Sequence, residues 1–337
     1  MTTHNTEHPF AEYIRILGKG KKGSRPLTQS EAYQAMQMIL AGEVEDIQLG
    51  AFLMLMRVKE ETPEELAGFV QAVRATLPKI DHQAADLDWS AYAGKRRHLP
   101  WYILSSLLLA ENGIKVLMHG SAAHTAGRLF AEDMLPLFSL PIADSFNAAQ
   151  QDIQTRNFAY LSLEQICPTL NKMIHLRSLM GLRSPVHTLV RLINPFNADY
   201  SIQGIFHPGY RPVHQEAALL LEQPNMAVLK GEGGETERNP DMDCLVQSVH
   251  HANLSEEVWP ALFARRHVKP EQLEPELLLQ VWQGTKQDEF AEASIIGTAA
   301  IALKLLGKAE SQAGAQQLAT DYWHQRNKMA FMLTKNL

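Results

Sequence analysis

WSAYAGKRRHLPWYILSSLLLAENGIKVLMHG, residues 89 to 120, is the stretch that decides the fold of this chain. Its pattern predicts a β-strand, a loop, a helix opening at Pro100 and a second strand ending at Gly120. In such a β-α-β unit the loop after the first strand faces the N-terminus of the helix, which is a common place for an anion. This loop has a single glycine, Gly94, followed by Lys95, Arg96, Arg97 and His98. Cationic side chains therefore stand where a phosphate-binding loop would carry glycines.

The composition is that of an ordinary globular protein. The chain has 337 residues, 45% hydrophobic and 20% charged, which is enough to bury a large core and predicts two lobes. With a net charge of −6, any binding of nucleic acid requires a local basic patch. We find no signal peptide and no apolar run of ~20 residues. Cys167 and Cys244 lack metal-ligand spacing, so we expect both to be reduced thiols. We therefore expect a cytoplasmic protein, and one without a membrane partner.

The first 80 residues predict a small all-helical lobe. Apolar residues recur at helical spacing from Phe10 to Leu17, and Gly18 ends that helix. Three further helices are predicted to begin after Thr28, at Asp46 and after Thr62, with capping boxes at both threonines.

From residue 81 to 337 the pattern predicts a large α/β lobe with a mainly parallel central sheet. Besides the opening unit, strands are predicted at 158–161, 199–206 and 226–230, and a helix at 125–138. The tail is predicted to run helix after helix, with residues 290–306 the clearest.

Three windows of sequence contain several cations and no acidic residue. They lie between Glu12 and Glu31, between Asp88 and Glu111, and between Glu164 and Asp199. If they meet in space, they form a groove that a polyanion could follow, with counterion release as the driving force. A solvated face is the alternative for each window.

The candidate nucleic-acid-binding residues come from these windows, with His119 at a strand end and Arg128 in the helix predicted to follow. They are Lys19, Lys21, Lys22, Arg25, Lys95, Arg96, Arg97, His119, Arg128, Arg177, Arg183 and Arg191. Flanking aromatic residues could stack on bases, with a place in the core as the alternative; they are Tyr92, Trp101 and Tyr102. For His119 a structural, hydrogen-bonded role is the alternative.

An acidic segment follows the strand predicted at 226–230. Its carboxylates could hold Mg²⁺ through waters, or form a plain acidic turn; they are Glu232, Glu235 and Glu237. The sequence has no nucleophile elbow and no zinc motif, so we expect no catalytic residue, no metal ligand and no cofactor.

Residues 27–74 resemble the N-terminal lobe of anthranilate phosphoribosyltransferases and of their relatives, the pyrimidine nucleoside phosphorylases. The resemblance continues through ENGIKVLMHGS at 111–121, RSPVHTLVRLINPF at 183–196, VLKGEGGE at 228–235 and SIIGTAAIALKLLG at 294–307. It implies a helical lobe, completed by helices from about 165–195, beside a large α/β lobe. It also implies a homodimer that forms through the helical lobe.

The departures from that family fall on its chemistry. The Gly-Thr-Gly-Gly-Asp diphosphate loop of the enzymes aligns with residues 92–96, and their Asp-Glu metal pair becomes Glu235-Thr236-Glu237. Phosphoribosyl transfer relies on metal and diphosphate positioning, so these changes indicate lost catalysis. The pattern resembles a non-catalytic branch of the family whose members bind nucleic acid.

We therefore expect a non-enzymatic, sequence-unspecific DNA- and RNA-binding protein that favours single strands along a basic groove of a homodimer. The alternative is a Mg²⁺-dependent phosphoribosyltransferase or nucleoside phosphorylase with an altered substrate. A scaffold that docks a protein partner on its cationic face is a third possibility.

Overall fold

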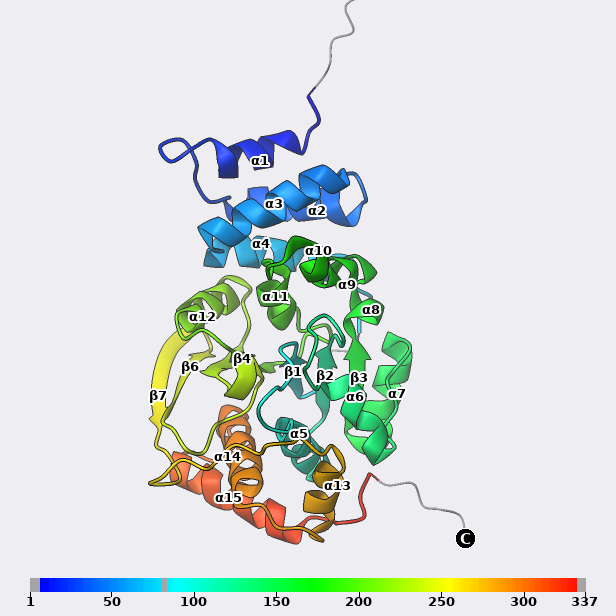
Figure 1. The fold of residues 1–337 in the computed structure, drawn as a ribbon, viewed down its shortest axis with the longest axis vertical. Coiled ribbons are helices and arrows are strands. Elements are labelled where there is room, and N and C mark those ends of the chain that lie inside the picture. The colour runs from blue at the N-terminus through cyan, green and yellow to red at the C-terminus, as the bar shows by residue number, and fades with distance from the viewer. Residues whose placement is uncertain (1–6, 81–83, 332–337) are drawn as a thin grey trace, which may run out of the picture.

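The computed structural model describes residues 7–80 and 84–331 (Figure 1). A small group of N-terminal helices lies at one end of the molecule, and a large α/β lobe forms the rest. This arrangement confirms the expected fold class. The division between the lobes near residue 80 stays a prediction.

Four helices form the N-terminal lobe: α1 (Ala11–Gly18), α2 (Gln29–Leu40), α3 (Asp46–Lys59) and α4 (Pro63–Arg74). The threonine before α2 and the one before α4 each form the expected capping box. The Thr28 side chain accepts from the Glu31 backbone nitrogen, and the Glu31 carboxylate accepts from the Thr28 nitrogen. Local capping thus fixes where these helices begin.

The α/β lobe is built on a seven-stranded sheet of order β3-β2-β1-β4-β5-β6-β7. Its parallel strands are β1 (Leu87–Ala91), β2 (Val116–Gly120), β3 (Phe158–Ser162), β4 (Tyr200–Ile205) and β5 (Asn225–Lys230). Their carboxyl ends lie at one edge of the sheet, where ligands of α/β proteins commonly bind.

The sheet continues into an antiparallel hairpin, β6 (Cys244–His250) and β7 (Asn253–Trp259). The expectation of a tail made only of helices is therefore wrong up to residue 259. Most residues of the edge strand β7 are exposed, so its sequence carries little of the alternation that identifies a strand. Three helices follow: α13 (Glu276–Gln283), α14 (Glu289–Leu305) and α15 (Gln312–Gln325).

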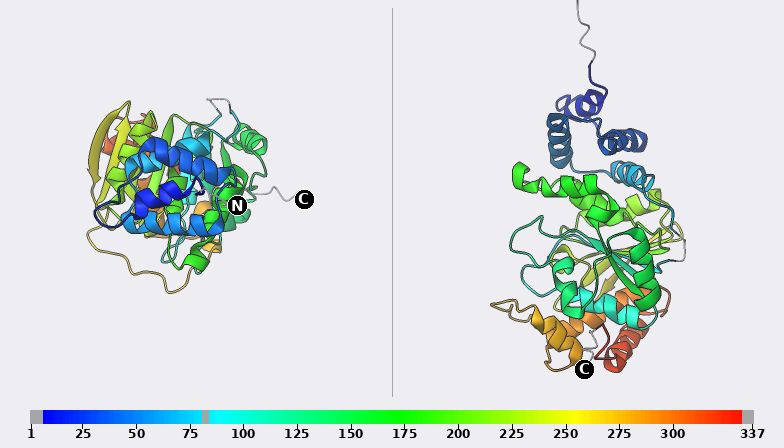
Figure 2. Two further views of the ribbon diagram at one scale, coloured as in Figure 1. Left: turned by 90° about the horizontal axis from the view of Figure 1, so that it is seen from above. Right: turned by 90° about the vertical axis from the view of Figure 1, so that its right-hand side faces the viewer.

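Helices connect the strands and cover the sheet on both sides (Figure 2). Those between β1 and β3 are α5 (Tyr102–Glu111), α6 (Ala131–Met134), η1 (Leu135–Phe138) and α7 (Phe146–Arg156). Those between β3 and β5 are α8 (Leu163–Ile166), α9 (Pro168–His175), α10 (Arg177–Met180), α11 (Val186–Leu189), η2 (Val190–Leu192) and α12 (Tyr210–Leu220), and η3 (Glu232–Gly234) follows β5.

The helix predicted over 125–138 is wrong in its first half. Residues 121–130 form a loop, and helical structure begins only at Ala131. Gly127 has a φ of +69°, outside the right-handed helical region, and Leu129 pairs with Lys95 across a short antiparallel bridge. Arg128 therefore belongs to a loop that lies against the loop after β1.

The hydrophobic core has two parts, one on each side of the sheet. One includes the helical lobe, with Phe52 and Phe69 buried, and continues into α9, α11 and α12. The other contains Trp89 of β1 and the apolar side chains of α5 and α14. Because α4 contacts both α11 and α12, the helical lobe is packed against the α/β lobe through these helices.

Candidate functional site

A cavity of about 550 Å³ lies at the carboxyl ends of β1, β4 and β5. Six of the side chains that line it are cationic: Arg96, Arg97, Arg128, Lys230, Arg266 and Lys269. Only two of its lining residues, Glu232 and Asp241, are acidic. In a chain with a net negative charge, this excess of positive charge favours an anionic ligand.

Two carboxylates from the segment after β5 hold the loop after β1. Glu235 Oε1 accepts from the backbone nitrogens of Ala93 at 2.9 Å and Gly94 at 2.5 Å. Glu237 Oε2 accepts from the backbone nitrogen of Tyr102, at the start of α5, at 2.8 Å. Carboxylates of the protein thus occupy positions where loop and helix nitrogens would otherwise face a bound anion.

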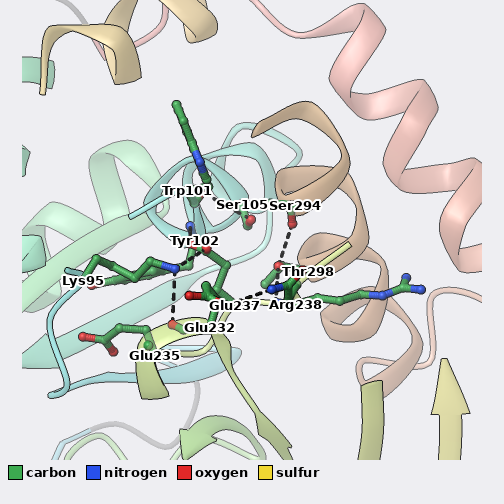
Figure 3. Close-up of polar contacts among 12 residues, drawn as sticks. Lys95, Trp101, Tyr102, Ser105, Glu232, Glu235, Glu237, Arg238, Ser294 and Thr298 are labelled. Carbon is green, nitrogen blue, oxygen red and sulfur yellow. Dashed lines mark hydrogen bonds and ion pairs between the residues drawn. The ribbon is translucent and has the colours of Figure 1, made fainter. Parts of the chain in front are cut away.

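The expected phosphate contact Lys95 is instead part of this internal network (Figure 3). Its Nζ lies 2.5 Å from Glu237 Oε1 and donates to the backbone oxygen of Glu232 at 3.2 Å. The Lys95 side chain is 1% exposed and that of Glu237 is fully buried. Lys95 therefore does not face the cavity in this structure, in contrast to its neighbours Arg96 and Arg97.

Burial shapes the electrostatics of these carboxylates. It raises the pKa of Glu237 to about 7, although Lys95 opposes the shift. It also raises the pKa of Glu235, against the hydrogen bond from Gly94 and the charge of Arg191. The expectation of a plain acidic turn is wrong, because both carboxylates lie inside the protein and join two distant loops.

Four arginines come together beside the cavity: Arg128 from the 121–130 loop, and Arg177, Arg183 and Arg191 from the third sequence window. Arg128 donates to the backbone oxygens of Ala93 and Gly94 at 3.0 and 2.9 Å, and Arg191 donates from Nε to that of Gly204 at 3.0 Å. Burial, with the charges of Arg128, Arg191 and Arg177, lowers the pKa of Arg183 to about 10. Among the described residues, Arg183 has no hydrogen bond or ion pair, so this cluster is short of negative charge.

The first basic window does not join this cluster. Lys19, Lys21 and Lys22 are exposed on the connection between α1 and α2, and none of them lines the cavity. Arg25 forms an ion pair with Glu31 at 2.6 Å. The structure therefore gives no single groove that runs through all three windows.

His119 lies in the core below the site. It is fully buried, its Nδ1 lies 2.7 Å from the Tyr92 hydroxyl, and its Nε2 lies 3.1 Å from Asp88 Oδ1. Tyr92, Trp101 and Tyr102 are at most 3% exposed. His119 is therefore a hydrogen-bonded residue of the protein interior, and the three aromatic residues belong to the core. Their rings are not accessible for stacking with bases.

Sequence reasoning missed several residues that line the cavity. Lys230 is the last residue of β5, so its place at the carboxyl edge could have been inferred from the predicted strand. Arg266 and Lys269 reach the cavity from the long segment after β7, and His207 from the segment after β4. No local pattern around Arg266 signalled this role.

Residues 11–77 match the helical bundle domain of a glycosyl transferase family, and residues 103–326 match the a/b domain of the same family. The second match alone covers more than half of the chain, which therefore belongs to this glycosyl transferase family.

Individual relatives agree with this assignment. The chain is 25% identical to anthranilate phosphoribosyltransferase of Geobacillus stearothermophilus over 91% of its length and 92% of the relative. It is 27% identical to the uncharacterized protein YbiB of Escherichia coli over 68% of its length and 73% of the relative. Anthranilate phosphoribosyltransferase from Saccharomyces cerevisiae, solved in complex with PRPP and Mg, shares the fold with a TM-score of 0.76 at 16% identity, covering 94% and 93% of the two chains.

These matches correct the functional expectation. A protein without catalytic activity was expected, yet the family is one of glycosyl transferases and its relatives include phosphoribosyltransferases. They give no support to nucleic-acid binding. The argument for lost catalysis rested on the changes to the diphosphate loop and to the metal pair. The cavity, however, provides arginine and lysine side chains that can bind an anion.

The site does not suit a divalent cation held by the 235–237 segment. Both Glu237 oxygens and one Glu235 oxygen already have protein partners, and one of these partners is an ammonium group. Mg²⁺ normally retains several waters, which these buried carboxylates leave no room for. Across residues 7–80 and 84–331, moreover, no group of three or more His, Cys, Asp or Glu side chains is arranged to hold a metal.

The same described part of the chain contains no helix of the length and apolarity needed to cross a membrane.

Proposed function

We propose that this chain is a glycosyl-transferring enzyme that binds a phosphorylated ribose in the cationic cavity at the carboxyl ends of β1, β4 and β5. The observation that carries the proposal is the six-to-two excess of cationic over acidic side chains around that cavity. The relatives support the choice of ligand, because several of them are anthranilate phosphoribosyltransferases.

Arg96 and Arg97 are the proposed phosphate contacts. Both are exposed, and neither forms a hydrogen bond or ion pair with another described residue. A guanidinium group binds phosphate with two parallel hydrogen bonds, so a pair of free arginines is well suited to a phosphate dianion. Arg128 also lines the cavity, but its guanidinium is already held by backbone oxygens. We assign it a positioning role beside the ligand.

The second substrate is also expected to be anionic. From Arg128 the positive surface extends to Arg177 in α10 and to Arg183 in the segment between α10 and α11. Reaction would break the bond from ribose C1 to a phosphate or diphosphate oxygen and form one from C1 to an acceptor nitrogen. The phosphate or diphosphate leaves with the electron pair of the broken bond.

This proposal is tested by ³¹P NMR of phosphoribosyl diphosphate or ribose 1-phosphate, incubated with the protein and with aromatic acids or free bases. Release of diphosphate or phosphate that requires an acceptor supports the proposal. Donors that stay intact with every acceptor, while a single-stranded oligonucleotide binds tightly, would contradict it.

Three features remain proposals beside this function. They are the homodimer through the helical lobe, the cytoplasmic location and the lobe boundary near residue 80.

A further inference from the structure

We propose that the Glu235–Glu237 segment holds no divalent cation in the ligand-free protein, because the Lys95 ammonium group occupies the position beside Glu237 that such a cation would need. This inference concerns the ligand-free protein, so it stands or falls separately from the proposed function.

The contacts around Lys95 leave no oxygen of Glu237 free. Lys95 Nζ donates to Glu237 Oε1 at 2.5 Å and to the Glu232 backbone oxygen at 3.2 Å. The Tyr102 backbone nitrogen donates to Glu237 Oε2 at 2.8 Å. The ammonium group thus has two oxygen ligands from the 232–237 segment (Figure 3). A cation of the protein already binds where a metal would have to bind.

One oxygen of each neighbouring carboxylate also has a protein partner. Glu235 Oε1 holds the backbone nitrogens of Ala93 and Gly94, and Glu232 Oε2 accepts from Asn239 Nδ2 at 2.8 Å. Recruiting Glu235 Oε1 to a metal would release the loop after β1. Recruiting Glu237 would leave the Lys95 ammonium buried without its partner, which is strongly destabilising.

Repulsion adds to this loss of ligands. A divalent ion bound to Glu237 would lie close to the Lys95 ammonium in a region that water does not reach, so the two positive charges would be poorly screened. Entry of the metal therefore requires Lys95 to leave, and Lys95 has no exposed path while its side chain is 1% exposed.

The test uses Mn²⁺ as the probe and electron paramagnetic resonance of the full-length protein without substrate. Wild type is expected to bind no Mn²⁺ with a dissociation constant below about 1 mM. Removal of the ammonium group in Lys95→Ala should free Glu237 Oε1 and create a Mn²⁺ site. The double variant Lys95→Ala/Glu237→Gln should lose that site again. Lys230→Ala removes a nearby cavity lysine that is exposed, and it should gain no site.

Stability provides the second readout. The melting temperature of Lys95→Ala should rise with Mg²⁺, whereas that of wild type should not change. Tight Mn²⁺ binding by wild type that Glu237→Gln abolishes would overturn the proposal, and this comparison decides the question even if Lys95→Ala does not fold. A folded Lys95→Ala protein without any Mn²⁺ site would also overturn it.

Discussion

The Glu235 carboxylate lies 2.5 Å from the backbone nitrogen of Gly94, although 141 residues separate them in the chain. Through this contact the segment after β5 fixes the shape of the loop after β1. Arg128 closes the same loop from the other side by binding the Gly94 backbone oxygen at 2.9 Å. The arginines that face the cavity, Arg96 and Arg97, are therefore carried by a loop that is held on both sides.

Glu235→Ala should destabilise the protein by about 1 to 3 kcal/mol, because the buried nitrogens of Ala93 and Gly94 lose their acceptor. Glu235→Gln keeps one acceptor oxygen and should lose less. Urea unfolding followed by circular dichroism measures both changes. Equal stability of Glu235→Ala and wild type would show that the carboxylate does not hold the loop.

Gly94→Ala should be more damaging than an alanine at another glycine of positive φ. Gly94 has φ +68°, and a Cβ there would lie 2.8 Å from Phe130 Cε1 and 2.9 Å from Arg128 Cβ. Gly113 has φ +82° with nothing within 4 Å, so Gly113→Ala introduces only the backbone strain of about 1 kcal/mol. Thermal melting of the two variants checks this order. If Gly113→Ala lowers the melting temperature as much as Gly94→Ala, the close packing around Gly94 is not the cause of the destabilisation.

Buried neutral histidines should make the protein sensitive to acid. Burial, aided by the charge of Arg191, lowers the pKa of His214 to about 3, and the imidazole Nδ1 lies 2.8 Å from Gln203 Oε1. Between that value and the unfolded pKa of about 6.5, the unfolded chain binds more protons. The stability that neutral His214 contributes is therefore fully present above pH ~6.5 and is lost as the pH falls below that value.

His214→Gln removes this dependence at one position. Between pH 7.5 and pH 5.0 the variant should lose about 2 kcal/mol less stability than wild type. Unfolding in urea at the two pH values gives the comparison. The matched control is His251→Asn, at an exposed position with φ +43°, which asparagine tolerates. A pH dependence left unchanged by His214→Gln would show that His214 is already charged in the folded state.

The parts of the fold that sequence predicted well depend on local signals. The capping boxes at Thr28 and Thr62 involve partners three residues away, so the sequence alone predicted where both helices begin. The loop after β1 was also placed correctly, because Gly94 and Pro100 stand between the apolar runs of its strand and helix.

The parts that failed depend on distant partners. Whether Lys95 faces solvent or Glu237 is decided by a residue 142 positions away, and no spacing reveals it. The same holds for Arg266, which enters the cavity from a long loop. Both strands of the hairpin were missed; in β7, five of the seven residues are exposed, which leaves no buried face in its sequence.

Calorimetric titration of ribose 5-phosphate into the full-length protein, in EDTA, tests the central claim most directly. We predict saturable binding that ribose does not reproduce and that falls at least tenfold, about 1.4 kcal/mol, in Arg96→Ala/Arg97→Ala. The control Lys21→Ala/Lys22→Ala removes the same charge from the helical lobe and should bind like wild type. Absence of binding, or equal loss in both double variants, would contradict a phosphate site at this cavity.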